Sequence, residues 1–176
     1  MKTLDLHIID IVHNSIRAKA SEIIIQIKDF ANANTLSLCI EDNGCGISAE
    51  KLQEINESFY SSRKERKIGM GLALLKYHAE LCDGSFSLNS VENIGTKVCA
   101  SFVRDHIDRQ PFGDLSGCIA NFICQYSEIN FIFRYYKDDN EFEISTNDVK
   151  EVFDNLELNN FNIISSLSEL IFNSLN

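Results

Sequence analysis

A hydrophobic run that ends in an acidic, glycine-containing turn is the feature that most limits how this chain can fold. The run covers residues 35–40, and the turn is the segment 41–47, with the sequence EDNGCGI. Asp42 lies where the strand would end, while Gly44 and Gly46 allow backbone conformations and close approaches that a Cβ atom would block. The segment therefore predicts a strand end at which a flat ligand meets bare backbone beside a carboxylate. An ordinary Asp-Asn-Gly hairpin is the alternative.

Composition places the chain among ordinary globular proteins. It has 176 residues, of which 44% are hydrophobic and 24% are charged, enough for one domain or for a domain with a substantial extension. It lacks the run of about 18 apolar residues that a membrane span needs, and its N-terminus does not resemble a signal peptide. We therefore expect a cytoplasmic protein with no membrane partner. Its six cysteines show no Cys-x-x-Cys pair, which favours reduced, mostly packed thiols over disulfides or zinc.

Charge is unevenly distributed along the chain. The net charge is −10, and residues 105–176 hold 13 acidic against 4 basic side chains. No basic region suited to a phosphate backbone exists, so nucleic acid is not an expected partner. The acidic segment would suit a basic protein surface or would simply keep the protein soluble, and the second interpretation is favoured.

The periodicity of apolar residues predicts a two-layer α/β sandwich in the first part of the chain. The predicted elements are, in order, a helix over 3–19, strands over 21–28 and 35–41, a short helix from 48 to about 56, a polar basic loop over 60–69, a helix over 71–81, and strands over 85–90 and 96–103. Two antiparallel strand pairs would then form a mixed, mostly antiparallel sheet with the helices on one face.

A change of composition around the only proline, Pro111, divides the chain into residues 1–104 and a small C-terminal α+β extension, residues 105–176. The extension is predicted to contain a helix over 114–126, strands over 129–136 and 141–145, and helical stretches over 147–155 and 162–175. Its aromatic first strand is interpreted as core rather than as a docking surface. Its last helix would pack on the first domain or on a partner, and no motif assigns the extension a role.

Two polar residues on the first predicted helix indicate a metal site. Asp10 and Asn14 are four residues apart and share one helix face, and Asp10 interrupts an otherwise apolar run. A carboxylate and an amide oxygen at this spacing can hold Mg²⁺ beside phosphates and orient a water molecule. The alternative is a capping or solvent-facing pair.

Two glycine motifs follow further along the chain. The segment 69–72 (Gly-Met-Gly-Leu) opens a helix, whose N-terminal N–H groups and dipole suit phosphate. Its spacing is neither that of the Rossmann motif nor that of a P-loop. Gly95 and Thr96 form a glycine turn with a hydroxyl before the last strand of the first part.

Taken in order, these motifs closely resemble the nucleotide-binding boxes of the GHKL superfamily, whose domain is called the Bergerat fold. The superfamily comprises type II topoisomerase ATPase domains, heat-shock chaperones, sensor histidine kinases and the MutL family. The resemblance covers residues 1 to 104 and rests on the segments 10–14, 42–46, 59–63, 69–72 and 95–96. Residues 13–20 and 42–47 look most like MutL proteins, whereas 59–72 looks like histidine kinases and anti-sigma factor serine kinases.

The resemblance implies a role for each matching residue. Asp42 would accept a hydrogen bond from the exocyclic amine of adenine, with Thr96 supporting that contact, and Asn14 would bind Mg²⁺ between the phosphates. The basic loop 63–67 would close over the triphosphate, although a solvated charge run is the alternative. The other positions that the resemblance places at the nucleotide are Gly44, Gly46, Ser61, Ser62, Arg63, Lys67, Gly69, Met70, Gly71 and Leu72.

Asp10 is a departure from the family pattern. It occupies the position where the ATP-hydrolysing members keep a glutamate that activates water. Aspartate is one methylene shorter, and a misplacement of about an ångström can slow a reaction roughly 10²-fold. The sequence therefore predicts slow ATP hydrolysis, or none, with Asp10 as the catalytic residue.

Three functions are compatible with these motifs, all with ATP and Mg²⁺ as ligands. The first is a nucleotide-dependent protein kinase or slow ATPase that acts on an unidentified partner protein, as the anti-sigma factor serine kinases do. The second, the catalytic half of a two-component sensor, is disfavoured because no helical hairpin with a phosphoacceptor histidine is expected beside the domain. The third is a non-catalytic ATP sensor whose docking to a partner depends on bound nucleotide. A mismatch-repair ATPase is disfavoured by the acidic second part. The sequence does not decide whether the protein forms a homodimer.

Overall fold

The computed structural model describes residues 1–60, 70–153 and 158–175. The strands are β1 (Glu22–Phe30), β2 (Thr35–Asp42), β3 (Phe86–Val91), β4 (Gly95–Val103), β5 (Asn130–Lys137) and β6 (Asn140–Ser145). The helices are α1 (Leu4–Arg17), α2 (Ala49–Tyr60), α3 (Met70–Leu81), α4 (Leu115–Gln125), α5 (Thr146–Phe153) and α6 (Phe161–Leu175). Within this described part, none of the helices combines the length and the apolar character that crossing a membrane requires.

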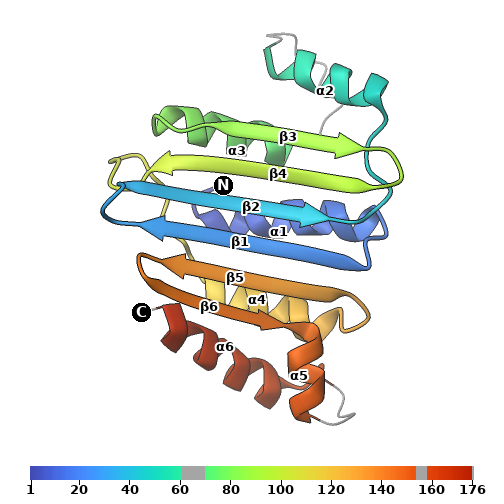
Figure 1. Cartoon of the computed structure of the whole chain (residues 1–176), viewed down its shortest axis with the longest axis vertical. Helices are drawn as coiled ribbons and strands as arrows, with labels where there is room; N and C mark the ends of the chain where they lie inside the picture. Colours follow the sequence, from blue (N-terminus) through green and yellow to red (C-terminus); the bar gives the residue numbers. More distant parts are fainter. Residues whose placement is uncertain (61–69, 154–157, 176) are drawn as a thin grey trace.

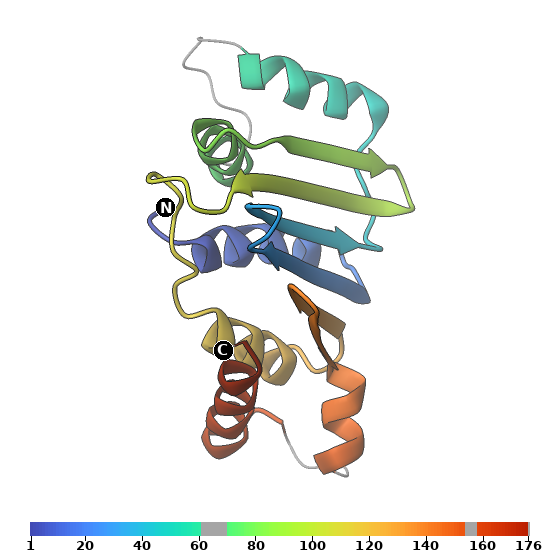
Figure 2. The same ribbon diagram turned by 60° about the vertical axis from the view of Figure 1, so that its left-hand side comes forward.

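The described strands form one six-stranded sheet with the order β3-β4-β2-β1-β5-β6 (Figure 1). Neighbouring strands are antiparallel except β1 and β5, which are parallel. Helices α1, α3 and α4 cover one face of the sheet, and no described helix lies over the opposite face (Figure 2). The predicted two-layer α/β sandwich with a mixed, mostly antiparallel sheet is therefore confirmed.

The core lies between the sheet and these helices because the side chains alternate along each strand. Every second residue of β1 is buried, and apart from Asp29 these residues are isoleucines, Ile23, Ile25 and Ile27. Strand side chains alternate between the two faces, so these three share the helix-covered face. Helix α1 presents Ile8 and Ile11 from its buried stripe, the spacing that places apolar residues on one side of a helix.

The C-terminal extension continues the sheet of the first part. Strand β5 pairs in parallel with β1, with Phe131 opposite Ile23, and β6 forms the edge of the sheet. Phe131, Phe133 and Tyr135 are buried, which confirms the interpretation of this aromatic strand as core, and α6 packs on α4. The division at residue 104 stays a prediction, while the sheet and its core run across it.

A buried carboxylate connects the extension to the first part. Asp29 of β1 is only 7% exposed. The guanidinium of Arg104, just after β4, donates a hydrogen bond to it at 2.5 Å, and the hydroxyl of Tyr135 in β5 lies within 3.4 Å of its second oxygen. Burial, and next the charge of Asp29, raise the pKa of Tyr135 to about 12. The carboxylate is thus paired, as a buried charge must be.

The structure corrects the expectation that the cysteines are all reduced. Cys39 of β2 and Cys99 of β4 are directly opposite in the strand ladder and form a disulfide, with their Cα atoms 4.2 Å apart. The other four cysteines are free. The bonded pair is separated by 60 residues in the sequence, so cysteine spacing could not reveal it. Only the pairing of β2 with β4 brings the two thiols together.

Two neighbouring histidines, the buried His7 and the partly buried His78, join α1, α3 and the segment that precedes α4. His7 has no exposed surface, and its Nε2 lies 3.0 Å from Oε1 of Gln110. The amide nitrogen of Gln110 lies 3.3 Å from Nε2 of His78. Burial is the main reason why the pKa of His7 is lowered to about 4. The hydrogen bond with Gln110 raises this pKa, whereas the charges of His78 and the N-terminal amine lower it further. Burial also lowers the pKa of His78.

We expect the protein to lose stability as the pH falls from 6.5 to about 4. The unfolded chain protonates His7 at its ordinary pKa of 6.5, whereas the folded protein keeps it neutral down to about pH 4. The unfolded state therefore binds more protons between pH 6.5 and about 4. Over this window the contribution of His7 lowers the free energy of unfolding by roughly 3 kcal/mol, and below about pH 4 it lowers it no further. Urea titrations across the window measure it. His7→Gln should remove most of this dependence, and His13→Gln on the same helix is the control; an unchanged dependence in His7→Gln would contradict the assignment.

Candidate functional site

The carboxylate of Asp42 lies at the end of β2, where two groups hold it. Its Oδ2 accepts the hydroxyl proton of Ser15 on α1 at 2.7 Å, and its Oδ1 accepts the backbone N–H of Gly44 at 2.9 Å. Asp42 itself is only partly buried. An ionised carboxylate offers about four acceptor positions, so two bonds fix its orientation and acceptor capacity is left for a ligand.

Ser15 was not among the residues predicted from the sequence. It is 2% exposed and lies in the buried stripe of α1, one turn after Ile11. A buried hydroxyl needs a hydrogen-bond partner. A serine within an otherwise apolar helix stripe is therefore the signal that could have identified it.

Thr96 of β4 is directly opposite Asp42 of β2 in the ladder. Its hydroxyl lies 2.9 Å from Oγ of Ser90 in β3. Ser90 accepts the N–H of Ile47 at 2.8 Å and donates its own proton to the carbonyl of Gly95 at 2.9 Å. Because that proton is used, Thr96 is the donor to Ser90, and the oxygen of Thr96 keeps acceptor capacity. Ser90 is a second residue that was not anticipated from the sequence.

Two glycines allow the turns around Asp42 to pack against each other. Gly46 has φ +62°, and a Cβ atom on it would lie 2.0 Å from the carbonyl oxygen of Val91. Gly95 has φ +146°, and a Cβ atom on it would lie 1.9 Å from the carbonyl oxygen of Asp42. Only glycine combines this backbone conformation with so close an approach. The described contacts thus give both glycines a role in building the site.

The turn that follows β2 is anchored by Asn43. Its side-chain oxygen accepts the backbone N–H groups of Ser21 and Glu22, both at 2.9 Å, and its amide donates to the hydroxyl of Ser21 at 2.9 Å. The N–H of Cys45 donates to the carbonyl of Ala18 at 2.9 Å. These bonds fix the turn against the connection between α1 and β1, so the carboxylate is held by rigid elements.

The structure brings Asp10 of α1 together with the glycine motif that opens α3. A Cβ atom on Gly71 would lie 1.8 Å from Oδ2 of Asp10, so the carboxylate lies directly against the first turn of α3. Helix N-termini carry unpaired N–H groups and a positive dipole end. Asn14, one turn further along α1, is exposed, and its side-chain oxygen accepts a hydrogen bond from Arg17 at 3.1 Å.

The remaining predicted positions divide into two groups. Met70 is the first residue of α3, and Leu72 is partly buried against the core. Ser61, Ser62, Arg63, Lys67 and Gly69 lie outside the described residues. The assignment of these five residues to the nucleotide stays a prediction, as does the closing of the basic loop 63–67 over the triphosphate.

Comparison with known sequences identifies relatives of the first part of the chain. A family model described as histidine kinase-, DNA gyrase B-, and HSP90-like ATPase matches residues 2–106. An uncharacterized sensor-like histidine kinase of Rhizobium meliloti is 30% identical over 103 residues, which are 56% of this chain and 20% of that protein. The heme sensor protein HssS of Staphylococcus saprophyticus is 32% identical over 94 residues, 53% of this chain and 20% of that protein. The chain therefore spans about a fifth of the length of these relatives.

A solved structure and the family match agree on the architecture. The N-terminal domain of a DNA repair protein superposes with a TM-score of 0.55 at 20% identity, over 87% of this chain and 57% of that one, a likeness of fold. The family model covers more than half of the chain, and the matched range contains Asp10, Asp42 and Thr96. The chain therefore belongs to the histidine kinase-, DNA gyrase B- and HSP90-like ATPase family, the GHKL superfamily.

Proposed function

We propose that the chain binds ATP with Mg²⁺ at this site and acts on a partner protein as a nucleotide-dependent kinase or a slow ATPase. The observation that carries the proposal is the carboxylate of Asp42, fixed by Ser15 and Gly44 and opposite Thr96. Such a carboxylate can accept a hydrogen bond from an amine, so it suits the exocyclic amine of adenine. Membership of an ATPase family supports the choice of ligand.

Helix α1 would position both ends of the nucleotide. Ser15 holds the residue proposed for adenine. Asp10 is five residues earlier on α1, roughly 7.5 Å along the helix axis, and lies against the N-terminal turn of α3. Phosphates at that helix end would meet free N–H groups and the positive end of the dipole. Helix α1 would therefore set the distance between the adenine end and the phosphate end of the site.

Asn14 fits the role of a Mg²⁺ ligand. Its side chain is exposed and shares a helix face with Asp10. Amide and carboxylate oxygens are the hard ligands that Mg²⁺ takes together with phosphate oxygens. When bound, the ion would neutralise charge on the phosphates, and the protein side chains would orient the nucleotide and the reacting water or hydroxyl.

Ser15→Ala tests the hydrogen bond that orients Asp42. We expect the Kd for Mg-ATP to rise roughly three- to tenfold, about 1 kcal/mol of binding free energy, because Asp42 is less firmly oriented toward the ligand without this hydrogen bond. Calorimetric titration of Mg-ATP measures it. Ser37→Ala, on β2 but on the opposite face of the sheet, is the matched control and should bind as the parent does. Parent-like binding by Ser15→Ala would mean that this bond does not orient the carboxylate for a ligand.

Asp10→Asn tests the catalytic half of the proposal. If Asp10 is the general base, phosphate release from γ-labelled ATP should fall by roughly 10²-fold, while calorimetry still detects ATP binding. The same assay with candidate partner proteins shows whether labelled phosphate is transferred to protein. An Asp10→Asn variant that hydrolyses ATP as fast as the parent would exclude Asp10 as the base.

A non-catalytic ATP sensor is the second candidate function. It is favoured by the shorter side chain of Asp10 and by its contact with Gly71, which places the carboxylate against α3. In this case a partner, or a second copy in a homodimer, would bind with an affinity that depends on ATP, and neither labelled protein nor free phosphate would form. Light scattering with and without Mg-ATP would identify the homodimer.

A further inference from the structure

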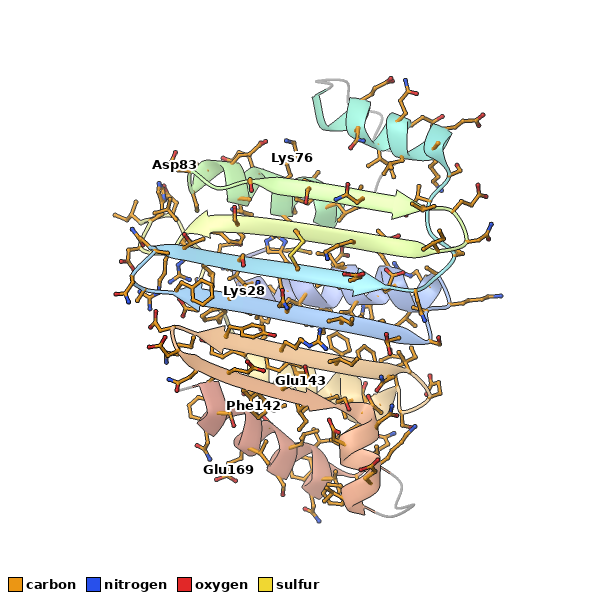
Figure 3. The ribbon with its side chains drawn as sticks, in the orientation of Figure 1. Lys28, Lys76, Asp83, Phe142, Glu143 and Glu169 are labelled. Atoms are coloured by element: carbon orange, nitrogen blue, oxygen red, sulfur yellow. A yellow bond between two sulfur atoms is a disulfide. The ribbon has the colours of Figure 1, made fainter. Side chains whose placement is uncertain are left out.

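The sheet face that carries none of the described helices, here called the open face, has the Cys39–Cys99 disulfide between the antiparallel strands β2 and β4 (Figure 3). Side chains two residues apart along a strand share a face, so the surroundings of the disulfide follow from the register. The neighbours along β2 and β4 and across to β1 and β3 are Ser37, Glu41, Lys97, Ser101, Gln26 and Ser87. All six are polar, and each is at least partly exposed.

The disulfide is accessible from solvent on this face. Cys39 and Cys99 are both partly exposed. Beside them, Glu41 and Lys97 form an ion pair at 2.8 Å. A cavity of about 250 Å³ lies beyond this ion pair at the strand ends, and its lining includes Asp42 and Thr96 but neither cysteine. The access to the disulfide thus rests on the partial exposure of the two cysteines among polar neighbours. A small polar molecule can therefore approach the sulfur atoms without displacing a helix or an apolar side chain from among these neighbours.

The free cysteines have different surroundings. Cys82, Cys118 and Cys124 are buried, whereas Cys45 is exposed. Burial raises the pKa of each of the three buried thiols, to about 12 for Cys118. A thiol that stays protonated and buried does not take part in exchange. Among the residues that the structure describes, the Cys39–Cys99 pair is thus the accessible disulfide and Cys45 is the exposed free thiol.

The disulfide is also close in the ladder to the ligand carboxylate. Asp42 follows Cys39 by three residues in β2, and Thr96 precedes Cys99 by three residues in β4, so that Asp42 and Thr96 are themselves opposite each other. The sulfur–sulfur bond therefore ties together the two strands that present both residues. A cross-link at this distance restricts how far the strand ends can separate.

We propose that the Cys39–Cys99 disulfide is a reversible modification site for small-molecule thiols, and that its opening weakens ligand binding at Asp42. The second clause rests on the proposed function. A small-molecule thiolate attacks one of the two sulfur atoms and forms a mixed disulfide with that cysteine. The protein S–S bond breaks in the same step, and the other cysteine is released as a thiolate. A second small-molecule thiol then displaces the first cysteine, which releases the small-molecule disulfide. In total the cysteine pair gains two electrons and two protons.

Thiol counting under native conditions tests the first clause. The folded oxidised protein should expose one reactive thiol, Cys45, and incubation with reduced glutathione should raise the count to three. Alkylation followed by peptide mass spectrometry should place the two new labels on Cys39 and Cys99. Reduction should lower the melting temperature by roughly 5–15 °C without unfolding the protein. A count that stays at one, or new labels on the buried cysteines instead, would overturn the proposal.

Calorimetric titration of Mg-ATP into the oxidised and the reduced protein tests the second clause. We expect the Kd to rise roughly fivefold or more on reduction. The double variant Cys39→Ser/Cys99→Ser should bind as the reduced parent does, with no further response to glutathione. Equal affinities in the two redox forms would overturn the coupling. If the oxidised protein binds no ATP at all, the proposed function fails instead, and the thiol count still decides the redox site.

Discussion

Replacing Asp42 by asparagine is expected to lower the affinity for Mg-ATP roughly 100-fold while the fold is kept. A carboxylate offers only acceptors, whereas an amide also presents N–H donors. The amine of adenine is itself a donor, so the variant loses one hydrogen bond and places two donors against each other. The amide oxygen can keep the N–H of Gly44. The amide nitrogen can then donate to the hydroxyl of Ser15, which lies 3.4 Å from the carbonyl of Ile11 and can donate there instead. The melting temperature should therefore fall by only roughly 2–4 °C. Calorimetric titration and thermal unfolding of the same preparation measure the two effects.

Glu41→Gln is the matched control for this variant. Glu41 is adjacent in β2 but projects from the open face, where it pairs with Lys97 at 2.8 Å. Exposed ion pairs contribute only about 0–1 kcal/mol to stability, so this variant should keep the ATP affinity of the parent. If Asp42→Asn binds Mg-ATP as the parent does, the ligand does not bind at the Asp42 carboxylate of β2. A loss in both variants would show that any change of charge at this strand end disturbs binding.

The sequence was sufficient to predict the elements and the placement of the chemical groups along them. Alternating isoleucines in β1 and the helical spacing in α1 are local patterns, and each element was predicted within a few residues of its position in the structure. The motif order also placed Asp42 at a strand end and Gly71 at a helix start. Both positions depend only on neighbouring residues, which is why local reasoning was enough for them.

The hydrogen bonds within the site could not be predicted in the same way. Ser15 and Ser90 are ordinary residues in a helix and a strand, and their role depends on partners 27 and 6 residues away in the sequence. The contact between Asp10 and Gly71 likewise needs α1 and α3 to be packed together. Side-chain partners on different elements are fixed by tertiary packing, which periodicity does not contain.

The C-terminal extension is a second feature that local sequence patterns could not predict, and here the missing information concerns the fold. Its strands were predicted correctly as elements but were interpreted as part of a small appendage. The parallel pairing of β5 with β1 joins Phe131 to Ile23 across 108 residues, and a crossover of that length leaves no local signal. The disulfide follows the same rule, because the register of β2 and β4 alone decides that Cys39 meets Cys99.

Gly95→Ala is expected to be the most damaging single substitution near the site, lowering the free energy of unfolding by about 3 kcal/mol or more. Two independent costs add. The backbone at this position has φ +146°, which an alanine rarely adopts, and the new Cβ atom would lie 1.9 Å from the carbonyl oxygen of Asp42. We expect the melting temperature to fall by roughly 6–12 °C, together with a loss of ATP binding because β2 must shift at the carboxylate. Thermal unfolding and calorimetry measure both.

Ile94→Ala separates this backbone effect from the loss of an apolar side chain in the same turn. Ile94 is 68% exposed, so its truncation should change the free energy of unfolding by no more than about 0.5 kcal/mol. The difference between the two variants therefore reports the packing of the β3–β4 turn against the end of β2. If Gly95→Ala kept the melting temperature of the parent, the turn would be free to move away from Asp42. The carboxylate would then be held by Ser15 and Gly44 alone, and Ser15→Ala should become the more harmful of the two changes for ATP binding.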